Sequence, residues 1–135
     1  LDLFYKYLEA SGNQNTISFL NFNEIKFSNS WGNKIMYSSE TYDINFTIDL
    51  FSSKNKNFEF EILNENYKTL NQGNFNTDYG FNKIKIPIII DKKLSGKYLK
   101  KIGFNSKISD DGNRYLSKGE YILKVDNQEL KFSVK

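Results

Sequence analysis

Residues 121–134, YILKVDNQELKFSV, decide the fold class of this chain. Apolar and polar side chains alternate on both sides of the turn-forming stretch 126–129, which is typical of a β-hairpin with one buried face. We expect a two-residue turn at Asn127-Gln128, because this register puts the six alternating apolar side chains on the same face. The resulting pairs are Val125 with Leu130, Leu123 with Phe132 and Tyr121 with Val134.

The same two-residue period recurs upstream of the hairpin and predicts further strands. It is found in segments 17–27, 42–50, 58–62 and 84–90. Residues 64–66 and 71–74 are rich in Asn, with Gly73 in the second group, and we interpret both as turns. Pro87 cannot donate a backbone hydrogen bond, so we expect its strand to be an edge strand or to carry a bulge there.

Two segments do not follow the strand pattern. Apolar side chains at Leu1, Phe4 and Leu8 have helical spacing, and Ser11-Gly12 provides a stop, so residues 1–15 are predicted to form a helix and a linker. Residues 94–104 fit either a strand or a short helix, and residues 109–113 fit a polar loop.

The number and spacing of the strands predict the architecture. Seven or eight short strands, separated by turn signals about every 8 to 12 residues, are typical of an antiparallel sandwich of two sheets. We therefore expect an all-β chain with one β-sandwich domain at 16–135, of immunoglobulin-like or jelly-roll type, preceded by the short helix.

The composition excludes many kinds of chemistry. The 135 residues include no cysteine and no histidine, so disulfides, Cys-containing zinc sites, Ser-His-Asp triads and Cys-His dyads are excluded. The net charge is +3 and Arg114 is the only arginine. Because the lysines are scattered and alternate with acidic residues, we expect no nucleic-acid partner. No apolar run has the length of a membrane span, and no cofactor is expected.

Two groups of acidic residues have a possible chemical role. Asp110-Asp111-Gly112-Asn113 resembles a fragment of a calcium loop, but Lys107 and Lys118 would occupy its first and last positions, which excludes an EF-hand. A solvated turn and an irregular calcium site both remain open. Glu59 and Glu61 could serve glycoside hydrolysis, but their alternation with apolar residues indicates the solvated face of a sheet. We therefore expect no enzyme activity.

Aromatic residues in or beside turns are the candidate ligand-binding groups. Their flat rings can pack against sugar rings, while nearby Asn, Asp and Gln side chains can bind sugar hydroxyls. Packing at the ends of the sandwich is the alternative role for each ring. The candidate site residues are Trp31, Tyr37, Tyr67, Tyr79 and Tyr115.

Four stretches of sequence together resemble a known family. They are YKYLE (5–9), ETYDINF (40–46), FEFEILN (58–64) and 116–125, which ends in Gly-x-Tyr-x-Leu-x-Val. They are similar to the C-terminal glycan-binding sandwich of the ATPase subunits of bacterial O-antigen ABC exporters. That resemblance implies recognition of an exported polysaccharide at the cytoplasmic face of the inner membrane. The final motif also resembles secreted and surface immunoglobulin-like modules of bacteria.

These observations predict a non-catalytic binding module, with a bacterial polysaccharide as the favoured ligand. The alternative is a secreted or surface-attached immunoglobulin-like module for adhesion or structure, whose partner is a protein. An extracytoplasmic location is expected unless the chain belongs to an exporter. An exposed sheet edge could also support a homodimer.

Overall fold

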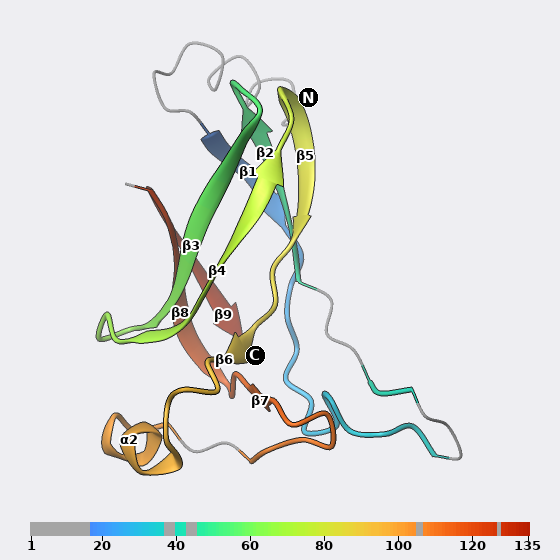
Figure 1. Ribbon diagram of the computed structural model, residues 1–135, viewed down its shortest axis with the longest axis vertical. Coiled ribbons are helices and arrows are strands. Elements are labelled where there is room, and N and C mark those ends of the chain that lie inside the picture. The colour runs from blue at the N-terminus through green and yellow to red at the C-terminus, as the bar shows by residue number, and fades with distance from the viewer. Residues whose placement is uncertain (1–16, 37–39, 43–45, 105–106, 127) are drawn as a thin grey trace.

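The computed structural model describes residues 17–36, 40–42, 46–104, 107–126 and 128–135 (Figure 1). Its strands are β1 (Ile17–Phe22), β2 (Thr47–Ser52), β3 (Lys56–Asn64), β4 (Thr69–Thr77), β5 (Gly80–Lys85), β6 (Ile89–Ile90), β7 (Arg114–Tyr115), β8 (Gly119–Val125) and β9 (Gln128–Val134). One short helix, α2, spans Gly96–Lys101. The predicted helix and linker at 1–15 lie outside the described residues.

The strands form two main sheets and one small one. The first sheet has the order β1-β2-β5, the second has the order β4-β3-β8-β9, and β6 pairs with β7. All of these pairs are antiparallel. The prediction of an all-β, antiparallel chain is therefore confirmed.

The two main sheets share one buried core. A single apolar cluster contains Ile48 and Leu50 from β2 together with Phe58 from β3 and Leu123 from β8. Phe46, which is fully buried, packs against both sheets. Its ring centroid lies 4.9 Å from that of Phe132 in β9 and 6.1 Å from that of Phe22 in β1.

The alternation predicted for 58–62 is confirmed in β3. Phe58, Phe60 and Ile62 are at most 3% exposed and belong to the core. Glu59 and Glu61 lie on the opposite face of the same strand, where Glu59 is exposed and Glu61 is half-buried. The period of two therefore separates a dry face from a wet one, as expected for a sheet covered on one side.

The C-terminal hairpin is present, but its predicted register is wrong by two residues. Val125 pairs with Gln128, and Leu123 pairs with Leu130. The turn therefore lies between Val125 and Gln128, and Gln128 itself belongs to β9. Asp126 has φ +52°, which a tight hairpin turn needs and which Asp tolerates better than most residues. A shift of two residues keeps every side chain on the same face, so alternation alone cannot detect it.

The predicted turn at 71–74 is also wrong, because these residues lie within β4. Each pairs with a residue of β3, and Gly73 lies opposite Phe60. A Cβ atom at Gly73 would lie 2.8 Å from Cζ of Phe60. The glycine therefore makes room for the phenylalanine ring in the middle of a strand and does not reverse the chain.

The segment 84–90 is strand-like but interrupted at Pro87. β5 ends at Lys85, β6 begins at Ile89, and Pro87 lies exposed between them. Ile86 and Ile88 are nevertheless buried, so the predicted inward phase is correct. Of the two alternatives for 94–104, the helix is confirmed, and the Ser95 side chain caps it by accepting a hydrogen bond from the Tyr98 amide.

Neighbouring segments form hydrogen bonds at both edge strands of the four-stranded sheet, β9 and β4. The segment after β1 crosses to the end of β9, where Ile25 forms a parallel bridge with Val134. Two hydrogen bonds with Lys135 fix this crossing, one donated by the Phe27 amide (2.8 Å) and one accepted by the Ile25 carbonyl (3.0 Å). The edge strand β4 is bonded on its outer side near Leu70, which accepts from the Asp91 amide.

A helix crosses a bilayer only if it is long and predominantly apolar. Within the described ranges, no helix combines the length and the apolar character that crossing a bilayer requires.

Candidate functional site

The five predicted ligand-binding residues lie in separate places. Trp31 and Tyr115 line the same pocket, and Tyr115 belongs to β7, which lies at the lower end of Figure 1. Tyr67 is in the β3–β4 turn and is 58% exposed, and Tyr79 is in the β4–β5 turn and is 67% exposed. Since β4 separates these two turns by about 25 Å, they cannot belong to one small site. Tyr37 lies outside the described residues.

The loop pocket is formed where the 27–33 segment meets the 107–117 segment. Its volume is about 440 Å³. The residues that line it are Phe27, Ser28, Asn29, Trp31, Asn33, Lys107, Ile108, Ser109, Tyr115 and Ser117. The pocket therefore combines three aromatic rings with hydroxyl groups, amide groups and one ammonium group.

The aromatic side of the loop pocket is a connected group of rings. Trp31 lies between Phe27, at a centroid distance of 5.8 Å, and Tyr115, at 6.2 Å. Trp31 is only 8% exposed, so it is not the exposed platform that the sequence suggested. Phe27 is 37% exposed and Tyr115 is half-buried, so these two rings offer more surface to a ligand than Trp31 does.

Hydrogen bonds between the two segments hold the pocket in shape. The Ser109 hydroxyl donates to the Trp31 carbonyl (2.5 Å), and the Asp111 amide donates to the Gly32 carbonyl (2.9 Å). Asp110 makes a reciprocal pair: its amide donates to Asn33 Oδ1 (3.0 Å), and its Oδ2 accepts from the Lys34 amide (2.8 Å). Segments about 77 residues apart in sequence are therefore joined through backbone groups.

Asp111 is the central acceptor of this network. Its carboxylate accepts hydrogen bonds from the Tyr115 hydroxyl and from the amide and side chain of Asn113. Partial desolvation acts to raise the pKa of Asp111. The hydrogen bonds from Tyr115 and Asn113, together with the nearby Lys92 ammonium, outweigh that effect, so the pKa lies below its ordinary value of 3.8.

This lowered pKa predicts a loss of stability in acid. The pKa of Asp111 is lower in the folded state than in the unfolded state. Asp111 therefore contributes fully to the free energy of unfolding at pH values above its ordinary pKa, and this contribution is lost as the pH falls through the pKa of the folded state. Tyr115→Phe removes one donor, so this variant should lose less stability than the wild type between neutral pH and about pH 3. Urea unfolding at several pH values measures the difference. Parallel pH curves for the two proteins would contradict this role of Asp111.

The Asp110–Asn113 stretch connects two loops through hydrogen bonds in the described structure. Its two carboxylates accept hydrogen bonds from Lys34, Asn113 and Tyr115. Among the described residues, no three acidic side chains are grouped so that they could hold a metal ion. These hydrogen bonds give the calcium-like stretch a structural role in joining the loops.

No protein-family model matches this chain. No curated protein matches it at a significant level of sequence similarity. The resemblance to exporter sandwiches and to bacterial surface modules therefore stays a prediction based on the residues quoted above.

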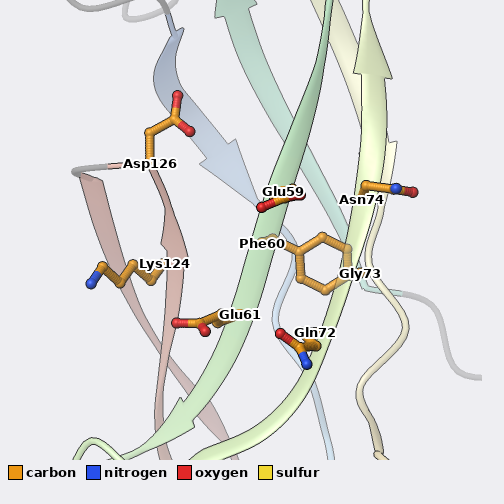
Figure 2. Close-up of a pocket in the computed structure, with 8 residues that line it drawn as sticks. All are labelled: Glu59, Phe60, Glu61, Gln72, Gly73, Asn74, Lys124 and Asp126. Atoms are coloured by element: carbon orange, nitrogen blue, oxygen red, sulfur yellow. The ribbon is translucent and has the colours of Figure 1, made fainter.

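A second depression, the sheet hollow, lies on the outer face of the four-stranded sheet (Figure 2). Its volume is about 400 Å³. The residues that line it are Glu59, Phe60, Glu61, Gln72, Gly73, Asn74, Lys124 and Asp126. Figure 2 shows the two glutamates on β3 between the amides of β4 on one side and Lys124 of β8 on the other, with Asp126 just past the end of β8. The sequence correctly placed Glu59 and Glu61 on a solvated face, but it did not predict the hollow.

Several lining residues of the loop pocket were missed in the sequence. Phe27 was interpreted as part of a strand, Ser109 as the start of a polar loop, and Ile108 was given no role. Their contribution depends on the contact between two loops that lie far apart in the chain. The one available signal was the density of Ser and Asn around Trp31 at 28–33, which is typical of polar loops.

Proposed function

We propose that this chain is a non-catalytic glycan-binding module whose ligand occupies the loop pocket. The observation that carries the proposal is the convergence of Phe27, Trp31 and Tyr115 with hydroxyl and amide side chains in one pocket. Aromatic faces can cover the apolar face of a sugar ring, and Ser and Asn groups can exchange hydrogen bonds with its hydroxyls. A bacterial polysaccharide is the favoured ligand.

The fixed shape of the pocket supports binding to a rigid ligand. The hydrogen bonds of Ser109, Asp110 and Asp111 join the two loops before any ligand arrives. Because less loop ordering is then required on binding, more of the contact energy contributes to affinity. The Asn29 side chain is exposed at the rim, and Lys107 brings a positive charge that could attract an acidic sugar.

The finer classification of the fold belongs to the same proposal. A three-stranded and a four-stranded antiparallel sheet share one core, which supports a β-sandwich of immunoglobulin-like or jelly-roll type. Modules of this architecture commonly present their loops at the ends of the sheets, where the loop pocket lies. We place the module outside the bacterial cytoplasm, or at the inner face of the inner membrane if it belongs to an exporter.

A protein-binding surface module is the second candidate function, and the edge strand β4 favours it. Residues 69–77 contain no charged residue and no proline, the two features that usually block pairing at a sheet edge. Such an edge can accept a strand from another protein or from a second copy of this chain. A concentration-dependent dimer that disappears in Asn74→Lys, measured by light scattering, would support this candidate.

The glycan proposal is tested with an array of bacterial surface polysaccharides and with Asn29→Ala. The Asn29 carbonyl accepts a hydrogen bond from Asn33 Nδ2 (3.1 Å), and this backbone group remains in the variant. We therefore expect stability within about 0.5 kcal/mol of the wild type. Affinity for a polysaccharide that the wild type binds should fall about three- to tenfold, since one ligand hydrogen bond is lost. Unchanged affinity would place the ligand elsewhere.

A further inference from the structure

We propose that the sheet hollow is a second binding site, for an extended glycan that carries free amino groups. The proposal does not depend on the loop pocket, because the two sites share no residue. It is based on the charges and hydrogen-bonding groups that β3, β4 and β8 present on one face (Figure 2).

The strand register brings amides and carboxylates side by side. Glu59 pairs with Asn74, and Glu61 pairs with Gln72 on one side and with Lys124 on the other. Each carboxylate thus has an amide group as its cross-strand neighbour. Amide groups both donate and accept hydrogen bonds, and carboxylates accept them, which is the set of groups that hydroxyl and amino substituents of a sugar need.

The charge of the hollow differs in sign from that of the whole chain. It contains three carboxylates and one ammonium group, whereas the chain has a net charge of +3. Asp126 is 3.8 Å from the ammonium group of Lys56. Within the described part of the chain, the side chains of Glu59 and Glu61 form no ion pair. A cationic ligand is therefore the complementary one.

The spacing of the two glutamates fits an amino group between them. Residues two apart on one face of a strand are separated by about 7 Å at their Cα atoms. Flexible carboxylates at that distance can converge on one ammonium group, and each can form a charge-assisted hydrogen bond. The open sheet surface suits an extended chain better than a compact ligand, because β4 continues past the hollow as far as Thr77. In this continuation Asn76 is hydrogen-bonded to Asn57 of β3 (2.8 Å).

Calorimetric titration at about pH 6 with the glucosamine hexamer tests the proposal. The N-acetylglucosamine hexamer has the same hydroxyls without the charge, and we expect it to bind at least tenfold more weakly. The double variant Glu59→Gln/Glu61→Gln should weaken binding of the glucosamine hexamer about tenfold. The double variant Glu65→Gln/Asp78→Asn makes the same change in net charge outside the hollow, and it should bind like the wild type.

The remaining outcomes separate this site from the loop pocket and from unspecific attraction. Asn29→Ala should bind the glucosamine hexamer like the wild type, so a failure of the glycan proposal for the loop pocket leaves this result intact. A lysine hexamer carries amino groups without sugar rings or hydroxyls, so it should bind more weakly than the glucosamine hexamer if the hollow recognises the sugar as well as its charge. Absence of glucosamine binding, equal binding of the acetylated or lysine hexamer, or an equal loss in the control variant would overturn the proposal.

Discussion

Gly32→Ala should lower the free energy of unfolding by about 2–4 kcal/mol and abolish ligand binding in the loop pocket. Gly32 has φ +76°, a conformation that is costly for any residue with a Cβ atom. The added Cβ would also lie 2.4 Å from Cε2 of Tyr115 and 2.7 Å from both carboxylate oxygens of Asp111. Both side chains would have to move, which breaks their hydrogen bond and displaces Tyr115, a lining residue of the pocket.

Gly103→Ala is the matched control for the contact at Gly32. Gly103 has a similar φ of +84°, but no atom lies within 4 Å of its added Cβ. Its replacement should therefore cost only the backbone strain, about 1–2 kcal/mol. Urea unfolding of both variants separates the two effects, and polysaccharide binding should survive in Gly103→Ala alone. Equal destabilisation by the two variants would mean that the close contact between loops is absent.

Phe46→Ala should destabilise the protein by about 3–5 kcal/mol. The side chain is completely buried and contacts Phe22 and Phe132, which belong to different sheets. Alanine leaves a cavity between the sheets that backbone pairing prevents from closing. This loss is a large part of the free energy of unfolding of a typical domain, which is about 5–15 kcal/mol. Phe46→Leu should lose less stability, so it provides a second measurement if the alanine variant does not fold.

The control for Phe46 is a phenylalanine on the sheet surface. Phe81 in β5 is 62% exposed, and its ring lies 5.8 Å from that of Phe51. Phe81→Ala should change stability by about 1 kcal/mol or less, because little buried area is lost. Urea unfolding in parallel with the Phe46 variants compares the two sites. Similar losses for Phe46→Ala and Phe81→Ala would show that the two sheets do not share the core described above.

Local alternation predicted the faces of the strands more successfully than their pairing. Phe58, Phe60 and Ile62 are buried as expected, since a period of two needs only nearest neighbours along the strand. The register of the final hairpin depends on which residue takes the positive φ of the turn. Asp126 takes it, and a shift by two residues leaves the pattern of faces unchanged.

The glycine and asparagine residues of β4 wrongly predicted a turn. The stretch 71–74 has the composition of a turn, yet it lies in a strand because Gly73 accommodates the ring of Phe60. That requirement comes from a residue in the neighbouring strand and cannot be found in the local sequence. Pro87 lies between β5 and β6 instead of at an edge position or a bulge within one strand, because its missing amide cannot pair in a ladder.

The candidate site could be predicted only in part. Trp31 and Tyr115 were selected as ligand-binding residues and do line one pocket, whereas Tyr67 and Tyr79 lie in turns at opposite ends of β4. Phe27 completes the group of rings, although its phase suggested a strand. Convergence of loops that are distant in sequence depends on tertiary contacts such as that of Ser109 with Trp31.

The most direct test of the glycan-binding proposal is a fluorescence titration of Trp31 with a polysaccharide that binds on the array. Trp31 is the only tryptophan, so the signal reports on the loop pocket alone. The account predicts a saturable change in emission, shifted to about three- to tenfold higher concentration in Asn29→Ala. Binding without any change in the emission of Trp31, or the same titration curve in both proteins, would contradict it.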